Sequence, residues 1–493
     1  MSSRLRKSGI AFIKFLVLGV FPYAVVFLSM LYVSLDTDLG WHLKYGEYFF
    51  QHGSILGENT FAVEMPDYKW VNSSWGTDIL SYSVFNKFGF LGISVLGALT
   101  MVGTFFVFSK AFRLTFWEKS IIFPVLVFSE EPLTQVSFRG HLVSLLFTGI
   151  LMYCLESWRR GKKFTIFLTI PLFLFWVNIH GEFILGIMLM AIWLCIYLYL
   201  SRPLTRNKML PAVLSFAGSV GATLINPFGF GVYLETLKHF GNPMQKYIVE
   251  WLPFDTYSFN WWQLVVWVSL VLLGIFLYWI KGKLKAMTPM LGIVGIMLFL
   301  SFTVRRYTWP MLLLSIPFMQ VVVASLKWDR LKFFNTLFAI SIFVGLCVYQ
   351  LHVRIPKLGL STYDWNAFCA NSGCSPLSAQ VLDQMKNRGK TLTFYNWGGY
   401  LIWNYPDLKP TIDGRMHLWR SDDGYSAFEA YYPYEQNWVD VDLSDYNTVY
   451  MATYKPLFTR MQQLVEEKKW VLRYRDQYAG IFQRAPILPS MNK

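Results

Sequence analysis

Long apolar runs separated by short clusters of Lys and Arg are the feature that most constrains how this chain can fold. Hydrophobic residues make up 54% of the 493 residues, and charged residues only 15%. Several of the runs reach the roughly 20 residues that cross a bilayer as a helix. A soluble protein of this size has no need for so much apolar surface. The sequence therefore predicts a polytopic α-helical membrane protein.

Hydropathy predicts about eleven membrane spans. The N-terminal run is too long for the core of a signal peptide and lacks a small-residue cleavage site, so we expect an uncleaved first span. The spans are placed near residues 13–33, 78–108, 119–136, 141–157, 164–178, 183–200, 210–226, 261–280, 287–303, 308–326 and 333–351.

Orientation follows from the distribution of Lys and Arg between the spans. The N-terminus and every second connection are basic, for example RRGKK at 159–163, whereas the intervening connections carry few positive charges. Because basic connections favour the cytoplasmic side, the N-terminus is predicted to be cytoplasmic and everything after about residue 352 to lie outside. The net charge of +14 is then an orientation signal, and we expect no nucleic-acid partner.

Two domains are expected. Residues 1–351 form the membrane domain, with outer loops at 34–77 and 227–260, and residues 352–493 form a small α/β domain outside the membrane. In the outer domain the patterns predict helices at 376–389 and 457–469, strands at 391–396 and 447–453, and a closing hairpin from 470–476 and 479–484. Residues 408–415 are predicted to form a strand that leads to a turn.

Five cysteines are present, and two of them lie in a polar segment. Cys369 and Cys374, in CANSGC, would close a small disulfide loop if their side of the membrane is oxidising. The others lie in apolar runs and are expected to be small core residues.

Unusual polar residues near the spans all fall on the predicted outer side. They are Asp36, Asp38, His42, Asn72, Trp75, Arg139, His141, Asn178, His180, Glu182, Asn226, Glu250, Arg305 and Arg306. A charge at membrane depth costs roughly 2.5–3.5 kcal/mol on insertion scales, so such residues usually face a bundle interior or a watered cavity. We interpret the one-sided set as an outward-facing polar cleft.

Each of these residues also has a structural interpretation. Asp38 fits as the N-cap of an amphipathic helix, LGWHLKYGEYFFQH, that ends at Gly53, with its side chain bonding the first N–H groups. The remaining interpretations are a satisfied core histidine for His180, backbone hydrogen bonds for Asn178 and Asn226, and snorkelling to lipid headgroups for Arg305 and Arg306.

The residue types in this set suit one kind of chemistry. The forked donors of arginine match phosphate oxygens, and fixed cations stabilise the charge that develops on a leaving phosphate. A carboxylate can act as general base toward an acceptor hydroxyl or amine. Asp-x-Asp spacing is also compatible with a divalent cation. The combination favours group transfer from a lipid phosphate at the membrane surface.

The motifs resemble those of a group of bacterial multi-pass proteins that are similar to the GT-C superfamily of membrane glycosyltransferases. They are DTDLGWHLKYGEY, SSWGTDIL, WVNIHGEFILG, LINPFG, VEW, VRRYTWP and GGYLIWNYPDLKPTIDGR, and they cover nearly the whole chain. The resemblance implies a polyprenyl-phosphate or polyprenyl-pyrophosphate sugar donor, inversion at the anomeric carbon, and transfer at the outer face of the bacterial plasma membrane. It also implies that an acidic residue of the first outer loop acts as base or metal ligand.

Carried onto this sequence, the resemblance implies Asp38 as the favoured base, with Asp36 supporting it or sharing a divalent cation with it. Thr37 stands between these acids, whereas aminoarabinose transferases and protein mannosyltransferases have an adjacent acidic pair, so the metal and the choice of base stay open. The resemblance assigns binding of the donor phosphate to Arg305 or Arg306, with Arg139 and His180 as further candidates. Other expected cleft residues are His42, Asn178, Glu182, Asn226 and Glu250.

The outer domain carries a last motif, with Gly399, Asp413 and Arg415. We expect structural turns there, with acceptor recognition as the alternative. Rival functions for the whole chain are a non-catalytic transporter, a lipid- or glycan-binding scaffold in envelope assembly, and a ligase or polymerase of lipid-linked glycans.

Overall fold

The computed structural model describes residues 19–129, 137–203, 205–239, 242, 246–325, 341, 345, 362–436 and 441–486. The chain divides into two compact units. Unit 1 comprises Met1–Val33, Leu91–Leu237 and Lys246–Gly359, and unit 2 comprises Ser34–Phe90, Lys238–Gln245 and Leu360–Lys493. The first outer loop, expected to belong with the membrane domain, thus packs with the C-terminal segment in unit 2.

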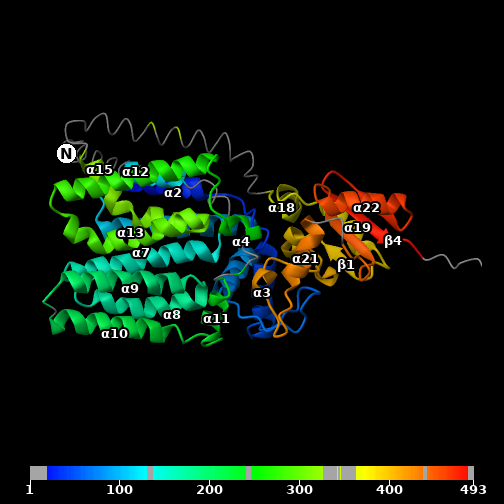
Figure 1. Ribbon diagram of the computed structural model, residues 1–493, viewed down its shortest axis with the longest axis horizontal. Coiled ribbons are helices and arrows are strands. Elements are labelled where there is room, and N and C mark those ends of the chain that lie inside the picture. The colour runs from blue at the N-terminus through cyan, green and yellow to red at the C-terminus, as the bar shows by residue number, and fades with distance from the viewer. Residues whose placement is uncertain are drawn as a thin grey trace, which may run out of the picture. The chain divides into compact units, whose positions relative to one another are not determined.

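Unit 1 is a bundle of apolar helices. In Figure 1 helices α7, α8, α9, α10, α12 and α13 run roughly parallel to one another. The described helices of this unit are α2 (Phe21–Met30), the second part of α4 (Trp75–Phe112), α5 (Phe116–Ser129), α7 (Gly140–Arg159), α8 (Thr169–Ile179), α9 (Phe183–Leu200), α10 (Arg206–Ala222), α11 (Gly231–Leu237), α12 (Phe259–Ile280), α13 (Leu284–Thr303), α14 (Thr308–Leu314) and α15 (Ile316–Ser325).

Among the described residues, five helices are long and apolar enough to cross a membrane. They are α4, α7, α9, α12 and α13, and the pair Arg305–Leu314 and Ile316–Ser325, bent by 51°, makes a sixth if it counts as one broken span. The predicted spans near 13–33 and 119–136 fall partly, and the one near 333–351 mostly, outside the described ranges. The prediction of a helical membrane protein is confirmed, and the count of about eleven spans stays a prediction.

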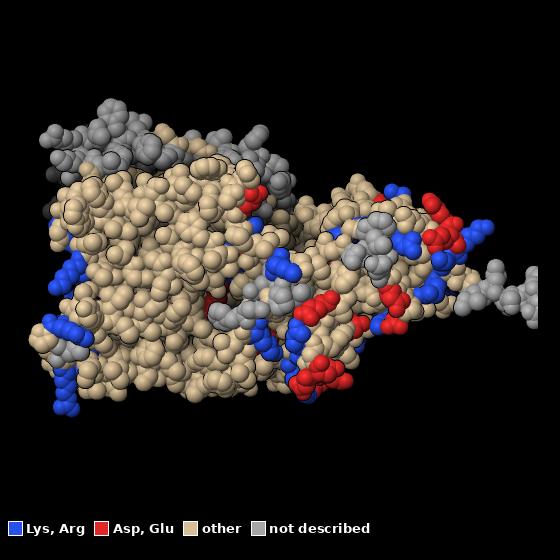
Figure 2. Space-filling view, viewed as in Figure 1, with Lys and Arg blue, Asp and Glu red and all other residues tan. Residues whose placement is uncertain are grey.

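The surface of the bundle fits lipid. Figure 2 shows a broad tan surface over these helices, with Lys and Arg side chains gathered at one end of the bundle. Helix α12 alone exposes Trp262, Val266, Phe276 and Trp279. Large apolar side chains exposed together in this way mark a protein–protein or membrane interaction surface.

The second predicted span differs from the structure at its start. Helix α4 contains a break at Gly89, which has φ 59° and ψ −151°. This conformation is open mainly to glycine because a Cβ would clash with the backbone. The apolar run is therefore two helices, and the part before Gly89 belongs to unit 2.

Unit 2 contains a four-stranded sheet in the order β1-β2-β4-β3. β1 (Thr391–Thr393) pairs parallel with β2 (Thr448–Ala452), which pairs antiparallel with β4 (Ala479–Arg484), and β3 (Trp470–Arg475) lies at the edge beside β4. The helices of this unit are α3 (Leu39–His52), α18 (Trp365–Asn371), α19 (Pro376–Gln384), α20 (Gly398–Asn404), α21 (Ala427–Gln436) and α22 (Pro456–Glu466). The predicted small α/β fold and closing hairpin are confirmed.

The prediction of a strand at 408–415 is wrong. The segment lies beside β1, but threonine side chains replace the backbone ladder. The backbone N–H of Thr393 donates to Thr411 Oγ1, and that of Thr411 donates to Thr393 Oγ1, both at 2.9 Å. The Thr411 hydroxyl in turn donates to the carbonyl of Thr391 at 2.8 Å.

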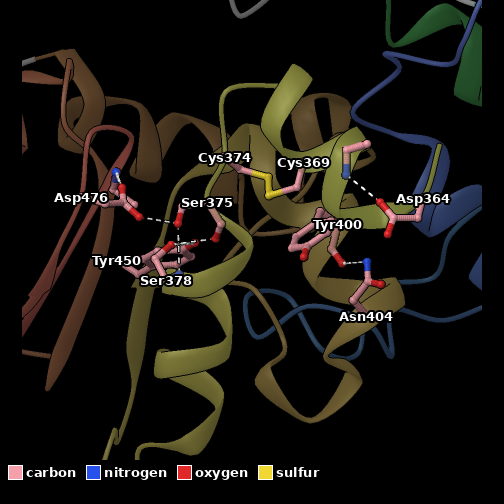
Figure 3. The surroundings of a disulfide bond; sticks show 11 residues. Asp364, Cys369, Cys374, Ser375, Ser378, Tyr400, Asn404, Tyr450 and Asp476 are labelled. Atoms are coloured by element: carbon pink, nitrogen blue, oxygen red, sulfur yellow. Dashed lines mark hydrogen bonds between the residues drawn. A yellow bond between two sulfur atoms is a disulfide. The ribbon is translucent and has the colours of Figure 1, made fainter. Parts of the chain in front are cut away.

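Cys369 and Cys374 form a disulfide, with their Cα atoms 4.9 Å apart (Figure 3). It closes the turn between α18 and α19. Ser375 follows directly, caps α19 by accepting from the N–H of Ser378, and donates to Asp476 in the β3–β4 turn. The disulfide loop is thereby tied to the sheet.

Helices α3 and α20 cross at two glycines. A Cβ on Gly40 would overlap the carbonyl of Gly399, and a Cβ on Gly399 would overlap the carbonyl of Thr37. The structural interpretation of Gly399 is therefore supported by direct backbone packing, which holds the acid-bearing segment before α3.

We expect Gly40→Ala to destabilise unit 2 by about 1–3 kcal/mol, the usual cost of overpacking, because the opposing atoms are backbone and cannot rotate away. The measurement is the melting temperature of the purified protein in detergent. Gly57→Ala is the matched control, since a Cβ at Gly57 meets nothing within 4 Å. Equal melting temperatures for the two variants would contradict the prediction.

Candidate functional site

Six polar side chains meet at one end of the unit 1 bundle, and we call them the Arg306 cluster. They are Arg139, His141, His180, Glu182, Glu250 and Arg306. Each comes from a helix end or a short turn: the start of α7, the α8–α9 connection, and the three-residue turns η4 (Val249–Trp251) and η5 (Arg305–Tyr307). Polar residues expected at four separate places along the sequence are thus brought together.

Glu182 is the centre of the cluster. Its carboxylate accepts from His141 Nδ1 at 2.8 and 2.9 Å and from Arg306 Nε at 3.1 Å, and it lies 3.6 Å from His180 Nδ1. Burial by itself would raise the pKa of the Glu182 carboxyl, but His141, His180 and Arg306 hold it well below its ordinary value. Glu182 is therefore ionised.

Arg306 joins the two carboxylates of the cluster. Its Nη1 donates to Glu250 Oε1 at 3.0 Å, while its Nε binds Glu182. The other oxygen of Glu250 lies 3.7 Å from Arg139 Nη1, and the Arg306 guanidinium stacks over Trp251 at 5.5 Å. Two guanidinium groups face two carboxylates, so these four side chains carry no net charge.

His180 is neutral. Burial lowers its pKa to about 3; the carboxylate of Glu182 opposes this shift and Arg306 adds to it. Its Nδ1 lies 3.0 Å from the Ser144 hydroxyl, which accepts from Trp176 Nε1 at 2.9 Å. Because the indole can only donate, the Ser144 hydroxyl accepts from Trp176 and can either donate to or accept from His180 Nδ1.

One ring nitrogen of His141 is buried without a hydrogen-bond partner among the described residues. Its Nδ1 must donate, since Glu182 can only accept. Its Nε2 is buried and has no hydrogen-bond partner among the described residues. Leaving a buried polar group unpaired costs about 1–3 kcal/mol, so a polar partner at this ring nitrogen would be stabilising.

Three predicted site residues of unit 1 lie outside the cluster. Arg305 points to the segment after η4, donating from Nε to the Leu252 carbonyl at 3.2 Å and from Nη2 to the Pro253 carbonyl at 2.8 Å. Asn178 donates to the backbone of residues 174 and 225, and Asn226 to that of residues 223 and 229. The structural interpretation of both asparagines is confirmed.

The acidic residues of the first outer loop lie in unit 2. Asp38 is the N-cap residue of α3, and the helix ends at Gly53 as predicted, but the Asp38 side chain makes no capping hydrogen bond. Asp36 Oδ1 instead accepts from the backbone N–H of Asp38 at 3.1 Å. The Asp38 carboxylate packs against Gly414, where a Cβ would overlap it. The side-chain cap assigned to Asp38 was wrong because Asp36 shapes this turn.

His42 is paired with an acid that the sequence analysis did not single out. Its Nδ1 lies 2.5 Å from Asp78 Oδ1, and Asn72 donates to Asp78 Oδ2 at 2.7 Å. The Asp78 side chain is fully buried, and His42 keeps 17% of its side chain exposed. The signal for Asp78 was an acid inside an apolar helical run.

Asp413 and Arg415 form a buried ion pair. Arg415 donates from Nε and Nη2 to the two carboxylate oxygens at 2.7 and 2.6 Å, and from Nη2 to Asn59 at 3.0 Å. Its guanidinium lies over Trp70 and Trp419 at 5.0 and 5.1 Å. The pair supports the turn at Gly414 from within the core of unit 2.

No group of three His, Cys, Asp or Glu side chains in the described ranges is arranged to hold a metal ion. A cation shared by Asp36 and Asp38 stays a prediction.

A scan against protein-family models and a search of curated proteins gave no match. Among solved structures, the chain is similar to ArnT from Cupriavidus metallidurans, determined with undecaprenyl phosphate bound. The TM-score is 0.51 at 13% identity, and the match covers 95% of this chain and 97% of ArnT. The fold is GT-C-like. The resemblance seen in the motifs is thus confirmed at the level of the fold.

The His42–Asp78 pair makes the stability of unit 2 depend on pH. Burial by itself would lower the pKa of His42, but Asp78, Asp36 and Asp38 raise it above its ordinary value. The stabilisation is therefore complete below about pH 6.5, the pKa of an unfolded histidine, and is lost as the pH rises through the higher folded pKa.

We expect the melting temperature of the wild type to fall relative to that of His42→Gln as the pH increases above about 6.5. His52→Gln is the matched control, because His52 is an exposed histidine on the same helix. If His42→Gln and His52→Gln showed the same pH dependence as the wild type, the pair would not be an ion pair.

Proposed function

We propose that the protein is a membrane glycosyltransferase, moving a sugar from a polyprenyl-phosphate donor to an acceptor on the outer face of the plasma membrane. The GT-C-like fold supports the class of enzyme, and the undecaprenyl phosphate bound by ArnT supports the class of donor. The basic end of unit 1 (Figure 2) would face the cytoplasm. The Cys369–Cys374 disulfide supports an oxidising, extracytoplasmic location for unit 2.

The Arg306 cluster is the observation that carries this proposal. It provides forked donors of the kind that bind phosphate, and it lies at the end of a lipid-facing bundle where a lipid phosphate would arrive. The buried Nε2 of His141 adds a ring nitrogen that lacks a partner among the described side chains. Of the two arginines predicted for the donor phosphate, Arg306 is favoured, since Arg305 holds the backbone of 252–253.

Asp38 is proposed as the general base. The acceptor hydroxyl or amine loses its proton to the carboxylate, its oxygen or nitrogen forms a bond to the anomeric carbon, and the bond from that carbon to the phosphate oxygen breaks. The electron pair stays on the departing polyprenyl phosphate, whose charge Arg306 and Arg139 would stabilise. Asp36 would support the base by holding the backbone N–H of Asp38.

We expect Asp38→Asn to lower transfer by about 10²–10⁴-fold without loss of folding, the usual contribution of a positioned base. A lipidomic comparison of a deletion strain with its parent would first identify the glycan or lipid that loses a sugar. Restoration of that product by each variant would then be measured, with melting temperature as the folding check.

Asp67→Asn is the matched control, because Asp67 is an exposed acid in the same loop, and it should restore the product fully. Full activity of Asp38→Asn would remove Asp38 as the base. If Asp36→Asn were fully active as well, the acidic-loop mechanism would fail.

A further inference from the structure

The two carboxylates of the Arg306 cluster differ in how firmly they are held. Glu182 has a side chain only 15% exposed and lies against His141, His180 and Arg306. Glu250 is 34% exposed, the highest value in the cluster, and the cluster side chains it contacts are the guanidinium groups of Arg306 and Arg139. Glu250 is thus the more exposed of the two carboxylates, and the attraction between partly exposed charges is weaker than that between buried ones.

The position of the Glu250 carboxylate is one that suits a phosphate. Its two oxygens lie 3.0 Å from Arg306 Nη1 and 3.7 Å from Arg139 Nη1, so it bridges two cations with separate oxygens. A phosphate group offers oxygens to arginine forks in the same way. With Glu250 in place the charges of the two arginines and two glutamates cancel. With Glu250 turned away, one positive charge is left to receive an anion.

The backbone of this region is fixed independently of the carboxylate. Arg305 donates from its backbone N–H at 3.0 Å and from Nε at 3.2 Å to the Leu252 carbonyl, and from Nη2 to the Pro253 carbonyl. Turn η4 can therefore stay in place while the Glu250 side chain rotates toward solvent. Displacement needs a change of side-chain rotamer and no movement of the turn.

We propose that Glu250 is an internal ligand that occupies the phosphate position of the Arg306 cluster and is displaced when the phosphate group of a polyprenyl phosphate binds. This inference rests on the proposed function. Glu250 then sets the affinity for the lipid donor, because each binding event must break its contacts with Arg306 and Arg139.

The test is direct binding of geranylgeranyl phosphate to the purified full-length protein in detergent, measured by isothermal titration calorimetry. We expect Glu250→Gln to bind roughly tenfold more tightly than the wild type, since the amide competes less well for the guanidinium groups. Arg306→Gln should bind at least about tenfold more weakly. Geranylgeraniol, which lacks the phosphate, corrects for partition of the chain into micelles.

Asp255→Asn is the matched control for charge. Asp255 is an exposed acid in the same connection, and its substitution removes the same negative charge without touching the cluster. We expect it to bind as the wild type does. Glu250→Asp is the second variant: its shorter side chain cannot bridge both arginines, and it should bind more tightly than the wild type but less tightly than Glu250→Gln.

Several results would overturn the inference. One is unchanged or weaker binding of geranylgeranyl phosphate by correctly folded Glu250→Gln and Glu250→Asp. Another is an equal gain in affinity in Asp255→Asn, which would show a general charge effect. A gain of Glu250→Gln for inorganic phosphate but not for geranylgeranyl phosphate would indicate a site for free phosphate and would overturn the lipid assignment.

Failure of the proposed function gives a different pattern. If neither the wild type nor Glu250→Gln bound geranylgeranyl phosphate more tightly than geranylgeraniol, the donor assignment itself would fail. If the wild type bound it in an Arg306-dependent manner with no effect of Glu250, the function would stand and only the internal-ligand inference would fail.

Discussion

Burial of charge at the end of an apolar bundle is the constraint on which the arrangement of unit 1 depends. A carboxylate taken out of water costs several kcal/mol unless charged or hydrogen-bonding partners surround it. Glu182 meets this requirement with His141 from α7 and Arg306 from η5. Since those partners lie 41 and 124 residues away along the chain, satisfying one carboxylate fixes the ends of several helices.

Close backbone contact plays the corresponding part in unit 2. The acid-bearing turn before α3 is held against α20 through Gly40 and Gly399, and against Gly414 through the carboxylate of Asp38. A side chain at any of these glycines would move the turn. The Asp413–Arg415 pair lies directly on either side of Gly414 and is itself buried among aromatic rings. The motifs that were predicted as structural turns therefore determine where a candidate catalytic carboxylate lies.

Much of this organisation could be predicted from composition and spacing, because bilayer thickness and charge asymmetry leave a direct record in sequence. The polar residues that form the Arg306 cluster were selected in that way, since a charge near a span needs a partner. What could not be predicted was which partner each residue takes. Asp36 accepts from a backbone N–H of the acidic turn, whereas Asp38 does not cap α3 with its side chain, and Arg306 rather than Arg305 enters the cluster. Such choices depend on backbone direction over a few ångströms, which residue spacing does not encode.

The same limit explains two wrong or incomplete predictions. The segment 408–415 has the composition of a strand, but the hydroxyls of Thr393 and Thr411 take the bonds that a ladder would use. The apolar run of α4 is continuous in hydropathy, whereas the conformation of Gly89 divides it. Both cases show side-chain or glycine chemistry overriding a pattern that is correct on average.

A site for a lipid phosphate also has to reject the many other phosphates of a membrane surface. Two bare arginines would bind phospholipid headgroups through the same forked donors that bind a donor lipid. An internal carboxylate lowers the affinity for every phosphate by the same amount, so only a ligand with further contacts can displace it. The buried Nε2 of His141, whose ring also contacts Glu182, is one place for such a contact. Discrimination between phosphates would come from such further contacts, while the contacts of Glu250 with the two arginines keep ligands that lack them weakly bound.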